Sequence, residues 1–240
     1  MRTRTRTALA TLLVCALGSA PSARAAAHAS QEYVGHSLRG RAIVAHESGV
    51  DGGRRVLVFG SIHGNETAGI PIAERLIDEP TVAGTDIWVV PDLNPDGTAL
   101  HRRQNAEGID LNRNFPYRWQ PLGSQGPFDY PGPRPLSEPE SRFAARLIAT
   151  LHPAVTIWFH QALRVVDLSG GSAAIERRFS RLVGLPLRRL ARYPGSGAGW
   201  QNHRFPGTTS FVVELPPGAL SRAAVDRYTR AVVALSRSGR

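Results

Sequence analysis

The sequence predicts a single α/β domain with a largely buried sheet. Short apolar runs alternate with stretches of helical periodicity, a pattern typical of strands that are connected through helices. The chain has 240 residues, and α/β enzymes often reach this length as one domain. Its hydrophobic fraction of 42% and charged fraction of 20% are ordinary for a globular protein. This composition excludes a disordered, collagenous or coiled-coil chain.

Residues 1–25 have the pattern of a secretory signal peptide. Arginines alternate with threonines at the start, an apolar stretch follows at 8–18, and Ala23-Arg24-Ala25 provides a small-x-small cleavage site. The single cysteine, Cys15, lies inside this segment, so we expect a mature chain without disulfides. We therefore expect a protein that is secreted to the extracellular space or the cell envelope. No apolar run in the sequence reaches the roughly 18 residues that a membrane span needs.

The folded domain is expected to cover residues 37–240, after a flexible leading segment over 26–36. Residues 41–47 predict an edge strand, whereas the continuous apolar run at 55–62 predicts a central strand that is buried on both faces. Periodicity and turn residues place the remaining elements. Further strands are expected at 86–93, 154–159 and 209–215, and helices at 67–77, 137–151, 171–185 and 221–236.

One long segment, 94–136, interrupts this alternation. It is rich in Pro, Gly and Asn and shows little periodicity, and irregular segments of this length in a compact domain are usually functional or disordered. The segment ends at a predicted capping box, in which Ser137 caps a helix and Glu140 bonds back to the cap.

Two polar residues follow the first buried strand at a spacing that suits a metal. His63 comes directly after the apolar run and Glu66 opens the next helix. Because ligands collect at the carboxyl ends of strands in open α/β sheets, this turn can aim an imidazole and a carboxylate at one point. Zn²⁺ accepts such nitrogen and oxygen donors. The competing interpretation is a helix-capping Glu beside a surface His.

His160 is the best candidate for a third ligand of one Zn²⁺ ion, which would leave a fourth position for water. It follows the apolar run 154–159 and so repeats the placement of His63. The competing interpretation is a core histidine bonded to the backbone. The other histidines precede the core, precede a strand or lie in irregular stretches: His28, His36, His46, His101, His152 and His203.

Glu214 is a carboxylate inside the apolar strand 209–215. Burial of a carboxylate is costly unless the group is paired or has a chemical task. Beside a zinc site, Glu214 would act as the general base toward the attacking water. The competing interpretation is a buried ion pair with one of the many arginines.

The irregular segment contributes groups that bind anions. Asn112 and Arg113 are adjacent, and Arg103 lies nine residues before Asn112. The planar guanidinium group can bind a carboxylate through two hydrogen bonds. One arginine can hold a substrate carboxylate while the other stabilises the oxyanion of the scissile carbonyl. Asp110 is placed to bond the far nitrogen of a zinc-bound histidine.

Together these residues resemble the zinc metallocarboxypeptidases of the carboxypeptidase A type. The resemblance covers about residues 35–218 and rests on motifs that occur in the family's order. They are His63-x-x-Glu66, Asn94-Pro95-Asp96-Gly97, the run 110–115, the run 137–140, His160 and Glu214. The short chain and His160-Gln161 look more like the bacterial murein peptide amidase branch, which cleaves the γ-D-glutamyl–diaminopimelate bond of cell-wall peptides.

The resemblance implies a mixed, mostly parallel sheet of about eight strands between helices. It implies that His63, Glu66 and His160 bind zinc and that Glu214 is the general base. Asn112 and Arg113 would hold the terminal carboxylate, Arg103 would stabilise the oxyanion and Asp110 would orient His63. By the same resemblance, Tyr193 is the residue that would correspond to a substrate-contacting family tyrosine. Ala198 and Gly199 suggest a roomy specificity pocket without a charged floor.

Two other functions remain open at this point. The aspartoacylase and succinylglutamate desuccinylase group shares the HGNE at 63–66 and the DLNR at 110–113, although the NPDG and SEPE motifs weigh against it. The second is a catalytically inactive module that binds the cell envelope through its basic surface. A nucleic-acid binder is disfavoured, because basic runs interleaved with aromatic residues are absent from the sequence. We expect a monomer that acts on a peptide or muropeptide.

Overall fold

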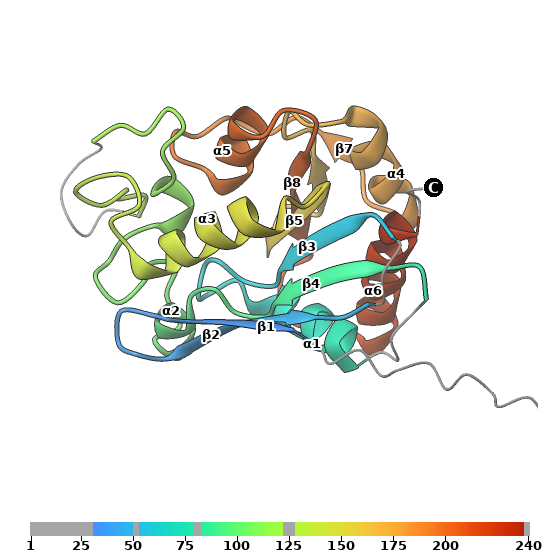
Figure 1. Cartoon of the computed structure of the whole chain (residues 1–240), viewed down its shortest axis with the longest axis horizontal. Coiled ribbons are helices and arrows are strands. Elements are labelled where there is room, and N and C mark those ends of the chain that lie inside the picture. The colour runs from blue at the N-terminus through green and yellow to red at the C-terminus, as the bar shows by residue number, and fades with distance from the viewer. Residues whose placement is uncertain (1–30, 50–52, 79–82, 122–127, 238–240) are drawn as a thin grey trace, which may run out of the picture.

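The computed structural model describes residues 31–49, 53–78, 83–121 and 128–237 (Figure 1). The predicted signal peptide, with Cys15, lies outside the described residues. Among the described helices, none combines the length and apolar character that crossing a membrane requires.

The described residues form one eight-stranded sheet and six α-helices. The strands are β1 (Glu32–His36), β2 (Ala42–Glu47), β3 (Arg55–Phe59), β4 (Asp86–Val90), β5 (Val155–Gln161), β6 (Val165–Asp167), β7 (Leu187–Arg188) and β8 (Thr209–Leu215). The helices are α1 (Ile70–Asp78), α2 (Pro95–Ala99), α3 (Pro139–Leu151), α4 (Ala173–Val183), α5 (Gly197–Arg204) and α6 (Arg222–Ser236). Two 3₁₀ turns, η1 (Thr67–Gly69) and η2 (Leu111–Arg113), lie in the connections.

The strand order is β1-β2-β4-β3-β5-β8-β6-β7. The four central strands β4, β3, β5 and β8 are parallel to one another, whereas β1, β2 and β6 pair in antiparallel fashion with at least one neighbour. The expected single α/β domain with a mixed, mostly parallel sheet is therefore confirmed. All four central strands end at the same edge, where the functional side chains were expected.

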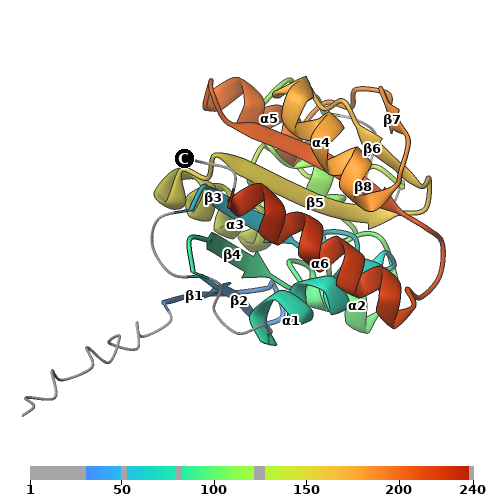
Figure 2. The same cartoon turned by 90° about the vertical axis from the view of Figure 1, so that its right-hand side faces the viewer.

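Alternation along the central strands builds a hydrophobic core on each face of the sheet. In β3, Val56 and Val58 pack into one core, and Leu57 and Phe59 pack into the other. The first core lies under α1, α4 and α6, and the second under α3 and α5. Figure 2 shows α6, α4 and α1 in front of the sheet and α3 behind it. Because both faces are covered, the central strands read as continuous apolar runs.

The first strands differ from the prediction. Residues Glu32–His36, expected within the flexible segment 26–36, form β1 and pair with β2 along its length. The strand predicted at the edge, 41–47, therefore lies inside the sheet, between β1 and β4. The five residues of β1 are exposed or half-buried, so their sequence lacks the apolar run that reveals a buried strand.

The predicted capping box at 137–140 is wrong. Helix α3 begins at Pro139, its N-cap residue is Glu138, and the Glu138 side chain makes no capping bond. Proline is favoured at the first helical position, which moves the helix start past Ser137. The Ser137 hydroxyl instead donates to Glu138, and Glu140 accepts from the backbone N–H of Leu38.

Several short elements were missed in the sequence, and two of them, α2 and η2, lie within the segment 94–136 that was expected to be irregular. Strands β6 and β7 contain three and two residues, which is too short for a periodic signal. Helix α5 begins with Gly-Ala-Gly, a composition that disfavours a helix. Strand β5 also extends to Gln161, so His160 lies within this strand rather than after it.

Candidate metal centre and active site

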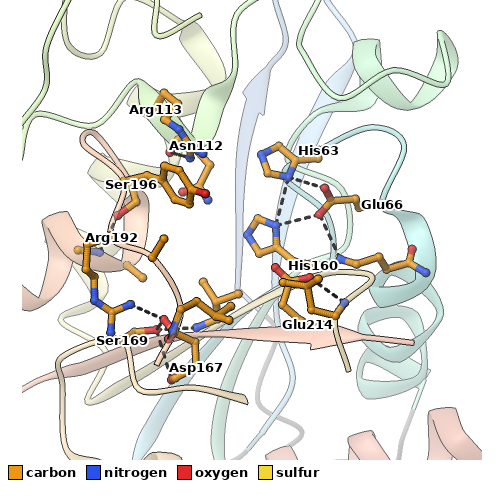
Figure 3. A pocket seen from close by; sticks show the side chains of 18 of the residues that line it. His63, Glu66, Asn112, Arg113, His160, Asp167, Ser169, Arg192, Ser196 and Glu214 are labelled. Carbon is orange, nitrogen blue, oxygen red and sulfur yellow. Dashed lines mark hydrogen bonds and ion pairs between the residues drawn. The ribbon is translucent and has the colours of Figure 1, made fainter. Parts of the chain in front are cut away.

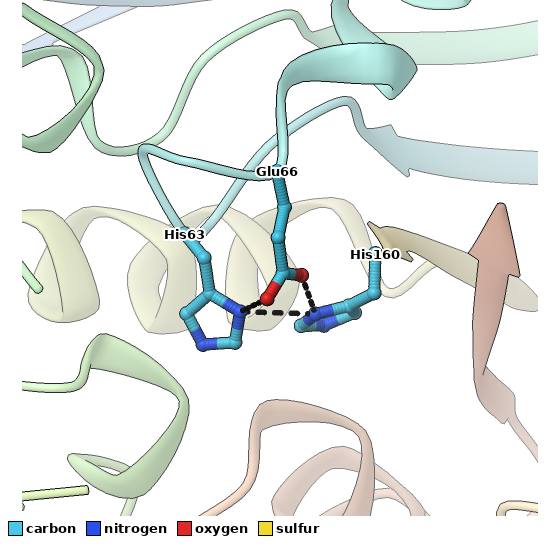
Figure 4. Close-up of side chains that lie close together, drawn as sticks. All are labelled: His63, Glu66 and His160. Carbon is cyan, nitrogen blue, oxygen red and sulfur yellow. Dashed lines mark hydrogen bonds and ion pairs between the residues drawn. The ribbon is translucent and has the colours of Figure 1, made fainter. Parts of the chain in front are cut away.

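His63, Glu66 and His160 converge at the carboxyl edge of the sheet (Figure 4). His63 follows β3, Glu66 is the N-cap residue of η1, and His160 belongs to β5. One potential ligand atom from each side chain lies within 4.8 Å of the others. The Glu66 carboxylate contacts His63 Nδ1 at 3.0 Å through one oxygen and His160 Nδ1 at 2.9 Å through the other.

The donor set fits a divalent cation. The two Nδ1 atoms face each other at 3.1 Å, an arrangement in which one imidazole must carry a proton unless a cation takes its place. All three side chains are buried, and two imidazole nitrogens with a carboxylate match the ligand chemistry of zinc. The other ring nitrogen of His160, Nε2, is buried without a hydrogen-bond partner in the described residues. The three residues can hold one metal ion.

Neighbouring charges shift the pKa values of Glu66 and His63. Burial alone would raise the pKa of Glu66, but the adjacent His63 and His160 outweigh it and hold that pKa well below its usual range. Burial alone would lower the pKa of His63, and the charges of Asp110 and Glu66 raise it instead. Glu66 is therefore an anion at neutral pH, as a metal ligand must be.

Asp110 fixes the orientation of His63 from behind. Its Oδ1 atom lies 3.0 Å from His63 Nε2, and its side chain is fully buried. A proton on Nε2 donated to Asp110 leaves the Nδ1 lone pair free to face the cluster. Asp110 also accepts from the backbone N–H of Asn112 at 2.9 Å. The same carboxylate thus joins the metal centre to the η2 turn.

Glu214 lies beside the cluster on β8. It is the direct register partner of His160 on β5, and its Oε2 accepts from the backbone N–H of Leu163 at 3.4 Å. Burial raises its pKa, and the negative charge of Glu66 raises it further, while His160 opposes both. Unlike Glu66, this carboxylate has no arginine among the interactions that the structure records for it. The ion-pair interpretation of Glu214 therefore has no support in the described residues.

Arg103 contacts both the cluster and Asp110. Its Nη1 donates to Glu66 at 2.9 Å and its Nε donates to Asp110 at 2.9 Å. The guanidinium stacks over the Phe128 ring at 4.6 Å from the centroid. A positive charge is thereby held at the rim of the metal centre.

Asn112 and Arg113 lie across the cavity from the cluster (Figure 3), and Tyr193 lines the same cavity. The guanidinium of Arg113 lies 4.2 Å from the centroid of the Tyr193 ring. Asn112 Oδ1 accepts from the backbone N–H of Gly197 at 3.0 Å, which ties η2 to α5. Arg113 Nε is buried without a hydrogen-bond partner in the described residues. The arrangement leaves a guanidinium with unused donors beside an aromatic ring.

One cavity of about 500 Å³ connects these groups, a volume typical of sites for small ligands. Every predicted site residue lines it except Asp110, which lies behind His63. The predicted site residues that line the cavity are His63, Glu66, Arg103, Asn112, Arg113, His160, Tyr193 and Glu214. Residues separated by up to about 150 positions in the sequence are thus brought to one hollow at the edge of the sheet.

The prediction of a specificity pocket without a charged floor is wrong. Ala198 and Gly199 do line the cavity, but Asp167, Ser169 and Arg192 line it as well. Asp167 ends β6, whose preceding residues gave no strand signal, and Arg192 is one of many arginines in the sequence. The only sequence signal for this part of the site was Asp167, an acidic residue directly after the apolar pair Val165-Val166.

Comparisons with known proteins agree with the geometry. A sequence profile described as zinc carboxypeptidase matches residues 22–175. Murein peptide amidase A of Escherichia coli (strain K12) is 29% identical over 182 residues, which cover 70% of this chain and 75% of that protein. The gamma-D-glutamyl-L-diamino acid endopeptidase 1 of Lysinibacillus sphaericus is 28% identical over 225 residues, covering 70% of this chain and 56% of that protein.

The fold is also similar to that of a murein-tripeptide amidase. The crystal structure of a murein-tripeptide amidase from Escherichia coli O157 superposes with a TM-score of 0.71 at 26% identity. The match covers 87% of this chain and 92% of that chain. The chain is therefore similar to these enzymes over nearly the whole length of the solved structure.

Proposed function

Because the chain belongs to the zinc carboxypeptidase family, we propose that it hydrolyses the γ-D-glutamyl–diamino acid bond of cell-wall peptides. The names of the murein peptide amidase and the γ-D-glutamyl-diamino acid endopeptidase support this substrate class. The observation that carries the proposal is the convergence of His63, Glu66 and His160, with Glu214 as a neighbour, in one cavity with Arg103 and Arg113.

His63, Glu66 and His160 hold the zinc ion in this proposal. Zinc bound there would polarise the scissile carbonyl and make a bound water more acidic. Asp110 keeps His63 in the tautomer whose Nδ1 faces the cluster, through the bond to Nε2.

Glu214 is the general base. It takes a proton from the attacking water and later returns that proton to the leaving amine. Its position fits both steps, since it neighbours His160 in the sheet register and lines the cavity. Its raised pKa brings its proton affinity closer to neutral pH, where proton transfer in both directions is efficient.

The remaining groups bind substrate in this proposal. Asn112 and Arg113 hold the terminal carboxylate, and Tyr193, stacked on Arg113, closes over it. Arg103 stabilises the oxyanion, for which its place beside Glu66 is suitable. We also propose that the protein is exported, which would bring the enzyme to its cell-wall substrate.

The test is a hydrolysis assay with the zinc-loaded protein and three substrates, read by mass spectrometry. They are the tripeptide L-alanyl-γ-D-glutamyl-meso-diaminopimelate, an α-linked peptide with a free C-terminus, and an N-acetyl amino acid. The proposal expects release of free diaminopimelate from the first substrate as the fastest reaction. Cleavage of the N-acetyl amino acid alone would assign the deacylase function, and zinc-independent binding of wall fragments without any cleavage would assign the inactive module.

A further inference from the structure

Asp167, Ser169 and Arg192 form the wall of the active-site cavity opposite the metal centre (Figure 3). None of the steps proposed above uses them. The three residues lie on β6, after β6 and in the connection between β7 and α5. Strand β6 is paired with β8 so that Val165 is the register partner of Glu214. This wall is therefore held at a fixed distance from the general base by the sheet itself.

Asp167 is buried and holds Arg192 in place. Its Oδ2 accepts from Arg192 Nη1 at 2.7 Å and from the Ser169 hydroxyl at 2.6 Å. Its Oδ1 accepts from the backbone N–H of Leu190 at 2.8 Å. Arg192 Nη2 donates to the carbonyl of Leu168. The guanidinium is thus fixed by two contacts before any ligand arrives.

Arg192 keeps donors for a ligand. A guanidinium has five N–H groups, and two of them serve Asp167 and Leu168, while the side chain of Arg192 remains 38% exposed. Asp167 has a side-chain exposure of 5%. With three donors on its four acceptor positions, Asp167 retains one position for a further donor. The wall therefore offers a fixed cationic fork and, beside it, one anionic acceptor position.

The wall is rigid behind these groups. The backbone N–H of Ser169 donates to the buried Glu176 of α4 at 3.0 Å, and the Ser169 hydroxyl accepts from the backbone N–H of Val212 at 3.1 Å. Ser196, Ala198 and Gly199 line the same cavity. These small side chains leave room for an extended side chain.

We infer that Asp167 and Arg192 select a substrate residue whose side chain ends in a carboxylate and an ammonium group. This inference rests on the proposed function. With the α-carboxylate at Asn112 and Arg113, the side chain extends along the small residues to the far wall. Arg192 then binds the distal carboxylate through its free N–H groups, and Asp167 accepts from the distal ammonium. A diamino dicarboxylic acid such as meso-diaminopimelate has both groups on one carbon.

The test compares two tripeptides that differ by one carboxylate. L-Alanyl-γ-D-glutamyl-meso-diaminopimelate and L-alanyl-γ-D-glutamyl-L-lysine are assayed for kcat/KM with the zinc-loaded wild type and with Arg192→Gln. The wild type should prefer the diaminopimelate peptide by about tenfold or more. In Arg192→Gln, kcat/KM should fall for the diaminopimelate peptide and stay unchanged for the lysine peptide, so that the preference is lost. Arg192→Lys should retain part of the preference. Arg189→Gln, a change at an exposed arginine that does not line the cavity, is the matched control and should behave as the wild type.

The outcomes separate the inference from the function on which it rests. Equal wild-type rates on both tripeptides, or an equal loss on both in Arg192→Gln, would overturn the specificity role and leave the amidase function standing. Such an equal loss with a lower Tm would mark Arg192 as purely structural. If the wild type cleaves neither tripeptide but does cleave an α-linked peptide, the proposed function fails and the inference fails with it.

Discussion

His160 and Glu214 lie directly opposite each other on the neighbouring parallel strands β5 and β8. One is a metal-ligand candidate and the other the proposed base, so their separation is set by the sheet register rather than by a loop. A slip of one residue in this pairing would turn Glu214 to the other face of the sheet. The seven register pairs from Val155↔Thr209 to Gln161↔Leu215 hold the two chemical groups in place.

Replacement of the base should separate metal binding from turnover. Glu214→Gln keeps the shape of the side chain but cannot take a proton, so kcat should fall on the order of 10²–10⁴-fold. Zinc content, measured by mass spectrometry of the metal, should stay at one ion per chain because Glu214 is outside the ligand set. An active Glu214→Gln enzyme refutes the assigned role.

The pH dependence of the reaction should report the burial of Glu214. The carboxylate form is the active one, so kcat/KM is lost as the pH falls through the pKa of Glu214. Burial raises that pKa, and the acid limb should therefore lie above the ordinary range of glutamate. A profile of kcat/KM between about pH 4 and 8 measures it. A limb at or below the usual glutamate value would show that Glu214 is solvated or is not the base.

Loss of the carboxylate behind His63 should weaken zinc binding. Asp110→Asn leaves a group that cannot accept the same charge-assisted bond from His63 Nε2, and such changes typically cost about 10–100-fold in metal affinity. Competition with a chromogenic chelator gives the Kd. Asp226→Asn, which removes an exposed ion pair with Arg75, is the matched control. Equal zinc affinities in the two variants would remove Asp110 from the metal centre.

Recognition of the terminal carboxylate should depend on Arg113. Arg113→Lys keeps the charge but loses the planar fork, so KM for a substrate with a free carboxylate should rise roughly tenfold. A substrate with an amidated terminus should be poor for the wild type and little affected by the change. Steady-state kinetics on the two substrates measure this difference. A similar effect of the substitution on both substrates would contradict carboxylate recognition.

The sequence was sufficient for the central sheet and for the convergence of the site. The apolar runs of β3, β5 and β8 are unambiguous because both faces are buried, and His63, His160 and Glu214 lie at or near their carboxyl ends. Parallel strands in one sheet bring such ends together, so spatial proximity follows from a local pattern. The predicted strand 154–159 began one residue before β5 and ended before His160.

The far wall of the site could not be predicted in the same way. Asp167 and Arg192 are 25 residues apart, and they meet because the short strands β6 and β7 pair with each other. Strands of three and two residues carry no period in the sequence. The edge strand β1 was missed for a related reason, since its residues are not buried and its position depends on pairing with β2.

The metal centre is tested most directly by the anomalous scattering of a crystal of the protein at the zinc absorption edge. We expect one zinc peak at about 2.0–2.2 Å from His63 Nδ1, His160 Nδ1 and a Glu66 oxygen, with Glu214 facing it but not bonded. A zinc-loaded crystal with no peak between these three side chains, or with its peak bound elsewhere, would contradict the central claim.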